Sequence, residues 1–210
     1  MTNIHFAIDD LVDHDWRQRG PNGMYGAGRK PGGVGNFSAV NTAGEFAVSL
    51  VEVNELILDQ LASAAITDAS ANEVTAPVTT ENEWSPTRIA WLMDFHRTRR
   101  DGLNGPAGEI TWAILLGDQV VGSVRLKQTA VPGILETGIW LIRRIRGQGV
   151  GRHAMTEMLR RAAALGALGV RADTTTSNRA ALGVLRRLGF DLVLTDDGSG
   201  IEAVLMFDIC

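Results

Sequence analysis

Alternating hydrophobic and polar residues mark several short segments of the chain downstream of residue 45. This period of two predicts strands over residues 46–51, 110–116, 120–126, 135–142, 170–174, 190–194 and 201–207. Apolar residues that recur every three or four positions predict helices over residues 55–66, from 85 onward, 150–165 and 178–188. The order of these elements is typical of an α/β fold, with helices on both sides of a mixed, mostly antiparallel sheet.

Turn and capping residues support these boundaries. Ser85 followed by Pro86 is typical of a helix N-cap and first helical position. Gly117 predicts a tight turn between two strands, and Gly189 predicts a left-handed residue that ends the last helix. The apolar face of the helix that starts at Ser85 is expected to contain Ile89, Leu92, Met93, Phe95 and His96. The stripe expected on the helix over 150–165 is Val150, Ala154, Met158, Ala162 and Leu165.

Composition and charge narrow the class of protein. The 210 residues can form one domain with a buried core, and 45% of them are hydrophobic. A formal net charge of −4 gives no broad attraction to nucleic acid or to an anionic membrane. The lone cysteine, Cys210, excludes an internal disulfide. No apolar run reaches membrane-spanning length, and the aspartate-rich start does not match a secretory signal. We therefore expect a cytoplasmic protein with no nucleic-acid, membrane or metal partner.

The first 44 residues differ from the rest of the chain. They are rich in Gly, Asn and Asp, with a Gly/Pro tract from Gly20 to Gly35 that resists regular structure. The tract is not a phosphate-binding loop, because Lys30 is followed by Pro31 rather than by Ser or Thr. We interpret residues 1–44 as an N-terminal extension and residues 45–210 as the domain.

The strongest chemical signal is the turn Arg146-Gly147-Gln148-Gly149-Val150-Gly151, which lies between a predicted strand and a predicted helix. Its glycines allow backbone N–H groups to point into one concavity, and the start of the helix adds unpaired N–H groups and the positive end of its dipole. This arrangement suits a pyrophosphate, with Arg146 and Arg152 to neutralise charge. A glycine-rich turn that binds nothing is the alternative. A dinucleotide fingerprint does not fit, because its third glycine would fall at Arg152.

Two blocks of the sequence resemble the GNAT acetyltransferases. Arg146-x-x-Gly149-x-Gly151 is similar to the family's R/Q-x-x-G-x-G/A signature, at the same strand-to-helix position. The segment from Ser177 to Phe190 resembles the later family motif, in which an asparagine opens a helix that ends in Gly-Phe. The resemblance covers roughly residues 45–207. Weaker similarities around 72–75, 85–86 and 136–141 resemble the branch that acetylates ribosomal-protein N-termini.

The resemblance implies acetyl-coenzyme A as co-substrate and assigns a site to it. The backbones of Leu141 and Arg143 would pair with the pantetheine arm like an added strand, and the N–H of Leu141 would face the thioester carbonyl. Asn178 would contact the same arm. Apart from the resemblance, an asparagine at the start of a helix is expected to serve as its N-cap, and both roles can hold together. The implied pyrophosphate site consists of Arg146, Gly147, Gln148, Gly149, Val150, Gly151 and Arg152.

The implied reaction is direct attack of a neutral primary amine on the acetyl thioester in a ternary complex. The acceptor is a protein N-terminus or a small-molecule amine. Glu136 is the candidate general base because it opens the strand that leads to the cleft, and a solvated structural carboxylate is the alternative. Glu52 and His96 are weaker candidates.

The sequence departs from the family where a general acid is expected. Leu185 occupies the position of the tyrosine that many members use to protonate the leaving thiolate, and Ala181 that of a serine used by the N-terminal-acetylating branch. The only tyrosine is Tyr25, in the extension. A non-catalytic acyl-coenzyme A sensor and an acyltransferase with another acyl donor therefore remain as alternatives. A homodimer is expected, since exposed sheet edges invite pairing.

Overall fold

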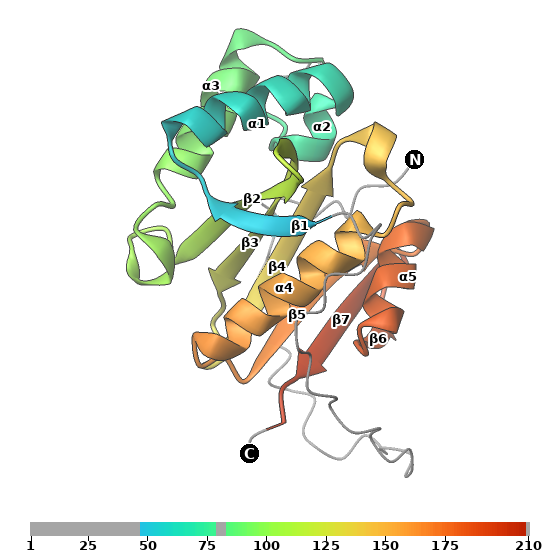
Figure 1. The fold of residues 1–210 in the computed structure, drawn as a ribbon. Helices are drawn as coiled ribbons and strands as arrows, with labels where there is room; N and C mark the ends of the chain where they lie inside the picture. Colours follow the sequence, from blue (N-terminus) through green and yellow to red (C-terminus); the bar gives the residue numbers. More distant parts are fainter. Residues whose placement is uncertain (1–46, 79–82, 209–210) are drawn as a thin grey trace. The chain divides into compact units, whose positions relative to one another are not determined.

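The computed structural model describes residues 47–78 and 83–208, which are coloured along the chain in Figure 1. The predicted extension over residues 1–44, with Tyr25, lies outside the described residues, as does Cys210. Across the described ranges, no helix is long and apolar enough to cross a membrane.

The described residues form one seven-stranded sheet with the order β1-β2-β3-β4-β5-β7-β6. Every neighbouring pair is antiparallel except β4 and β5, so the prediction of a mixed, mostly antiparallel sheet is confirmed. Strand β1 precedes the first helices, and Gly117 lies in the two-residue turn between β2 and β3 at a φ of 59°. The strands are β1 (Val48–Glu52), β2 (Glu109–Leu116), β3 (Gln119–Gln128), β4 (Ile134–Leu141), β5 (Gly169–Thr175), β6 (Asp191–Leu194) and β7 (Gly200–Met206).

Helices cover both faces of this sheet, and Figure 1 shows α4 lying across one of them with α5 beside it. Ser85 caps α3 by accepting a hydrogen bond from the N–H of Arg88, with Pro86 at the first position as predicted. Gly189 follows α5 at a φ of 86°, the predicted left-handed cap. The helices are α1 (Glu55–Asp68), α2 (Ala71–Val74), α3 (Pro86–Arg97), α4 (Val150–Ala164) and α5 (Arg179–Arg187), with short 3₁₀ turns at Gly102–Asn104 and Arg143–Ile145.

The two faces of the sheet differ in chemistry. Apolar side chains at alternate positions of the strands point toward α4, and Trp112, Leu126 and Val170 are among these buried side chains. Strand alternation turns the intervening residues to the opposite face, which α1 and α3 cover at the β1–β3 end. There His96 of α3 contacts Thr111 of β2. We call this opposite side the polar face.

Two details of the predicted helix faces are wrong. Arg88, rather than Ile89, is fully buried on α3, where its guanidinium donates a hydrogen bond to Thr75 Oγ1. Leu165 is 55% exposed, because α4 ends one residue earlier and its last apolar contact with the sheet is Ala162. The four-residue helix α2 is not predicted by periodicity, since it is shorter than two helical turns.

The single parallel ladder in the described sheet is short. Strands β4 and β5 pair only through Ile134, Leu135 and Glu136 opposite Gly169, Val170 and Arg171. Both strands then continue, to Leu141 and Thr175, without further pairing to each other. We call the gap that opens beyond this ladder the β4–β5 split. It leaves backbone groups of β4 without a strand partner on that side.

Candidate functional site

The loop between β4 and α4 presents unpaired backbone N–H groups, as the sequence predicts. Gly147 and Gly149 have φ values of 80° and 86°, in the left-handed region that favours glycine. Within the described part of the chain, no hydrogen bond engages the N–H groups of Gly149, Val150, Gly151 or Arg152. These donors meet at the first turn of the 15-residue helix α4, where the dipole also favours an anion.

The side chain of Arg146 holds this loop in place through hydrogen bonds to the end of β4 and to α2. Its Nε donates to the carbonyl oxygen of Leu141 at 2.9 Å. Its two terminal nitrogens donate to the two carboxylate oxygens of Glu73, on α2, at 3.2 and 3.1 Å. Glu73 in turn accepts from the N–H of Ser70, which completes a capping box at the start of α2. The guanidinium therefore ties the loop to α2, and its charge is already paired.

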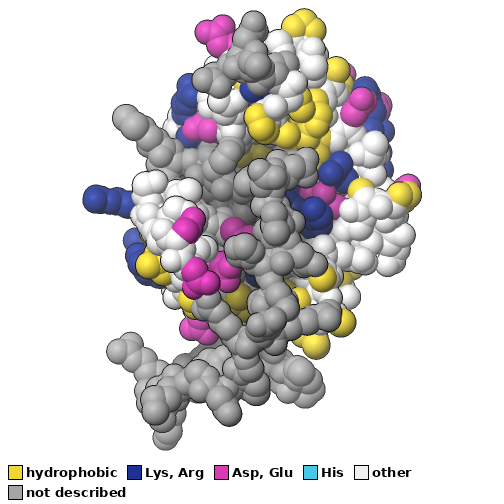
Figure 2. All heavy atoms as spheres, turned by 180° about the vertical axis from the view of Figure 1, so that it is seen from behind, with side chains coloured by type: hydrophobic (Ala, Val, Ile, Leu, Met, Phe, Trp, Pro, Cys, Tyr) yellow, Lys and Arg dark blue, Asp and Glu magenta, His cyan; other side chains and the backbone are white. Residues whose placement is uncertain are grey.

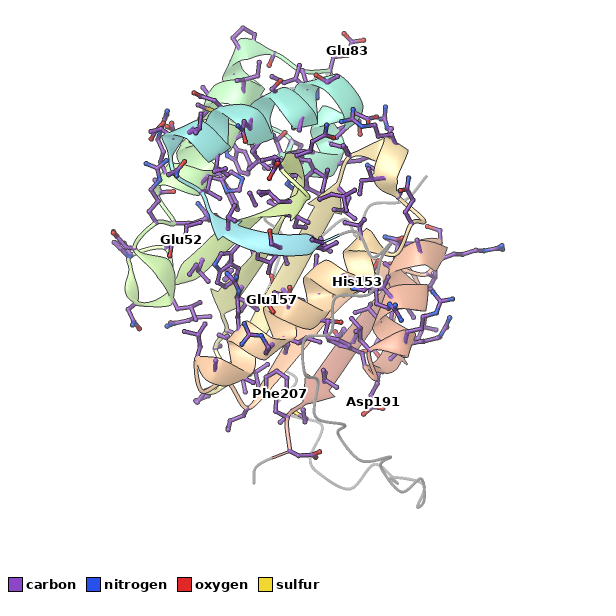
Figure 3. All side chains as sticks on the ribbon, viewed as in Figure 1. Glu52, Glu83, His153, Glu157, Asp191 and Phe207 are labelled. Atoms are coloured by element: carbon purple, nitrogen blue, oxygen red, sulfur yellow. The ribbon has the colours of Figure 1, made fainter. Side chains whose placement is uncertain are left out.

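The remaining side chains of the loop differ in accessibility. Gln148 is exposed and donates to the carbonyl oxygen of Arg144 at 2.9 Å. Val150 is buried, so it can offer an anion only its N–H. Arg152 is exposed, and no ion pair engages it among residues 47–78 and 83–208. His153 lies on the same turn of α4, on the side of α5 (Figure 3). Arg152 is thus the cation best placed to neutralise a bound phosphate.

The edge of β4 that borders the split carries the backbone groups of Leu141. The N–H of Ile142 donates to the carbonyl oxygen of Val121 on β3. Since successive N–H groups of a strand point to opposite sides, the N–H of Leu141 points away from β3 and toward the split. Arg143 lies two residues beyond the end of β4, at the start of a 3₁₀ turn, and its guanidinium is 3.8 Å from the carboxylate of Glu73. The pairing of its backbone with a pantetheine arm stays a prediction.

Two residues of the C-terminal half border the other side of the split. Asn178 caps α5 by accepting a hydrogen bond from the N–H of Ala181 at 3.2 Å, which is one of the two roles that the sequence allows it. Its contact with a pantetheine arm stays a prediction. Thr174, on β5 past the last β4 pair, is buried, and its hydroxyl has no hydrogen-bond partner in the ranges described. A buried hydroxyl without a partner costs about 1–3 kcal/mol.

Glu136, the candidate base, belongs to a ladder of ion pairs across the polar face. Its two carboxylate oxygens accept hydrogen bonds from Arg125 at 2.8 Å and from Arg171 at 2.7 Å. Arg125 also bonds to Glu109, which pairs with Arg99 at 2.7 Å. Burial alone would raise the pKa of Glu136, but the charges and hydrogen bonds of the two arginines outweigh it and lower the pKa. A carboxylate held in this way accepts a proton poorly at neutral pH.

The two weaker candidates for the base lie elsewhere. Glu52 is exposed at the far end of β1, on the opposite side of the molecule from His153 in Figure 3. His96 is 1% exposed, and its Nδ1 lies 2.9 Å from Thr111 Oγ1. Burial, together with the charges of Arg99 and Arg100, lowers the pKa of His96 to about 3. It is a neutral packing residue between α3 and β2.

The positions at which the family carries hydroxyl residues are buried here. Leu185 is completely buried in the hydrophobic core, and Ala181 is 1% exposed. Both face the sheet from α5. The described residues thus contain no hydroxyl at either place.

Asp173 is a functional candidate that sequence reasoning missed. It lies on β5, two residues past the last pair with β4, on the polar face. The alternation Val170-Arg171-Ala172-Asp173-Thr174 was the available signal, because it puts Arg171 and Asp173 on one face. The alternation does not show which strand pairs with β5 next to Arg171 and Asp173, so it could not place Asp173 beside the split.

Comparisons with known proteins agree with this geometry. A model described as the acetyltransferase (GNAT) family matches residues 77–190. No curated protein sequence matches the chain. Among solved structures, the PaiA N-acetyltransferase of Thermoplasma acidophilum, in complex with coenzyme A, is similar over 77% of this chain and 99% of its own, with 15% identity and a TM-score of 0.54.

Two further structures show the same fold. The Campylobacter jejuni N-acetyltransferase PseH, in complex with acetyl coenzyme A, is similar over 77% of this chain and 100% of its own (14% identity, TM-score 0.55). An acetyltransferase of Thermus thermophilus is similar over 76% of this chain and 97% of its own (17% identity, TM-score 0.56). The matched family model spans more than half of the sequence and includes the loop, the split and the helix after it. The chain belongs to the GNAT acetyltransferase family.

Proposed function

We propose that this protein transfers an acetyl group from acetyl-coenzyme A to a primary amine by direct attack in a ternary complex. The observation that supports it most is the juxtaposition of the unpaired N–H groups at the start of α4 with the unpaired edge of β4. One can hold a pyrophosphate and the other an amide-bearing arm. The solved relatives in complex with coenzyme A or acetyl coenzyme A support the choice of co-substrate.

Each residue of the proposed site has a separate task. Gly147, Gly149 and Gly151 allow the diphosphate to approach the backbone, and Arg152 adds charge from the exposed side of α4. The N–H of Leu141, directed into the split, would stabilise negative charge on the thioester oxygen. Holding amine and thioester together in the split would supply much of the acceleration.

The acceptor is either a protein N-terminus or a small-molecule amine. A panel of peptides with free N-termini, polyamines and amino acids, assayed by release of the coenzyme A thiol, tests the proposal. Turnover of at least one amine is expected. Tight binding of acetyl-coenzyme A without turnover of any amine would favour the sensor, and faster turnover of a longer acyl thioester would favour another donor.

We also propose a homodimer in the cytoplasm. The edge strands β1 and β6 present unpaired backbone groups within the described sheet, and a twofold pair would cover one of them. Light scattering at micromolar concentration is expected to give twice the mass of 22.6 kDa. A monomer would contradict the proposal.

A further inference from the structure

Asp173 faces the β4–β5 split from the polar face. Glu136 pairs with Arg171 in the last step of the parallel ladder, and Gly138 and Asp173 follow two residues later on the two strands. Both therefore stand on the polar face at the same level, with the split between them. Gly138 contributes no side chain there. The carboxylate of Asp173 is thus the first polar side chain on this face of β5 after Arg171, the residue at which the pairing with β4 ends.

The charges around Asp173 set it apart from Glu136. On β7, Glu202 stands directly opposite Asp173 in the register. Burial is the main cause that raises the pKa of Asp173, and the neighbouring charges of Glu136 and Glu202 add to it, while Arg171 and Arg125 oppose it. No hydrogen bond holds the Asp173 carboxylate within the described ranges. The group is therefore free to accept a proton and holds it more strongly than an ordinary aspartate.

The surrounding surface suits a cation. Figure 2 shows acidic side chains gathered on the part of the polar face near β6 and β7. Asp191 of β6 lies on the same face through its register partner Val204, but one strand farther from the split, so it is not part of the proposed site. An ammonium group that entered here would find carboxylates on β5 and β7 beside the split.

We propose that Asp173 is the general base that removes the proton from the attacking amine, and that Glu202 attracts the ammonium form of the acceptor; this rests on the acetyl transfer proposed above. The ammonium gives one proton to the Asp173 carboxylate, directly or through a water. The neutral nitrogen then attacks the thioester carbonyl carbon, a C–N bond forms, and the C–S bond breaks. The sulfur leaves as thiolate, and the amide nitrogen and Asp173 return their protons to solvent and thiolate.

The test compares Asp173→Asn with Asp191→Asn, which removes one charge from the same face at an exposed position one strand beyond β7. Asp173→Asn is expected to bind acetyl-coenzyme A with unchanged affinity in calorimetry and to lower kcat/KM about a hundredfold at pH 7. The loss should shrink as pH rises, because more of the amine is already neutral. Asp191→Asn should retain the wild-type rate.

Two further variants separate the roles. Asp173→Ala should lose activity in the same way, and added formate should restore part of it, which a structural defect would not allow. Glu202→Gln should raise KM for the amine while kcat changes less than about threefold. Asp173→Asn keeps the shape of the side chain and should leave Tm unchanged, so that its loss of activity is not a loss of folding.

The outcomes distinguish this inference from the proposed function. Hydrolysis of acetyl-coenzyme A by water provides a readout that needs no known acceptor, and it should also fall in Asp173→Asn. A rate within about threefold of wild type, or no rescue by formate, would overturn the role of Asp173. A wild-type protein that binds acetyl-coenzyme A but releases no thiol, with amines or with water, would overturn it too. Absence of acetyl-coenzyme A binding in the wild type would instead contradict the proposed function.

Discussion

Arg146 and Glu73 are 73 positions apart in the sequence and meet through two parallel hydrogen bonds of 3.2 and 3.1 Å. The pair joins the loop before α4 to the short helix α2. Burial would raise the pKa of Glu73, but the hydrogen bonds and charge of Arg146, with the bonds from Ser70, lower it to about 2. Stability from this pair is therefore present above pH 4.5 and is lost as the pH falls toward 2.

Glu73→Gln should destabilise the protein by removing the charged partner of Arg146. We expect a loss of about 2 kcal/mol, which lowers Tm by about 4–8 °C in a domain of this size. Glu55→Gln is the matched control. The pKa of Glu55 is also lowered to about 2, through hydrogen bonds from Arg97 and Arg100, but its side chain is 57% exposed. Its replacement should change Tm far less. Equal shifts of Tm would contradict a structural role for the Arg146 pair.

Gly149→Ala should abolish binding of acetyl-coenzyme A. The new Cβ would stand in the concavity and would strain a backbone at a φ of 86°. Gly166→Ala provides the control at the other end of α4, since Gly166 has a φ of 81° and no atom near its missing Cβ. Both variants should lose similar stability in thermal unfolding. Calorimetry should show binding by Gly166→Ala only, and binding by both would refute the assignment of the loop.

The buried His96 should make the folded protein sensitive to mild acid. Its pKa is lowered to about 3 in the folded state, so between pH 6.5 and 3 the unfolded chain takes up a proton that the folded protein does not. Stability from the neutral ring is complete above pH 6.5 and falls as the pH drops, by about 2 kcal/mol at pH 5. Urea unfolding at pH 7.5 and 5 should show this loss in the wild type and a smaller one in His96→Gln. An identical loss in both proteins would exclude His96 as its source.

The pH profile of kcat/KM should rise to a plateau without a descending limb. Leu185 has an aliphatic side chain with no proton to donate, and it is fully buried, so this position cannot protonate the leaving group. A coenzyme A thiol, with a pKa near that of a free cysteine at about 8.5, can leave as thiolate without an acid. Amine deprotonation should therefore limit the rate. Tyr25→Phe should leave the profile unchanged. A fall above about pH 9 in folded protein, absent in Tyr25→Phe, would show that the N-terminal extension supplies the acid.

Much of this architecture follows from local sequence. The period of two predicts the strands, the period of 3.6 predicts the longer helices, and Ser85, Gly117 and Gly189 mark boundaries that the structure confirms. The glycines of the loop before α4 permit the positive φ values that Gly147 and Gly149 adopt. These features depend on residues a few positions apart.

What could not be predicted depends on residues distant in the sequence. The pairing of Arg146 with Glu73, the burial of Arg88 and the ion pairs that hold Glu136 each need the relative placement of separate elements. Alternation in β5 shows that Asp173 shares a face with Arg171, but not that β7 brings Glu202 beside it. The place of Glu136 in its own strand favours it as the base, whereas its two arginine partners belong to other strands.

The three-residue ladder between β4 and β5 also has a mechanical consequence. It divides the sheet into two panels, β1–β4 and β5–β7–β6, which share backbone hydrogen bonds only near Ile134 to Glu136. Each panel is continuous within itself, so we expect local opening to concentrate at the seam and amide hydrogens there to exchange ahead of those in the panel centres. A co-substrate bridging the seam would replace the missing ladder and make the two panels open as one cooperative unit.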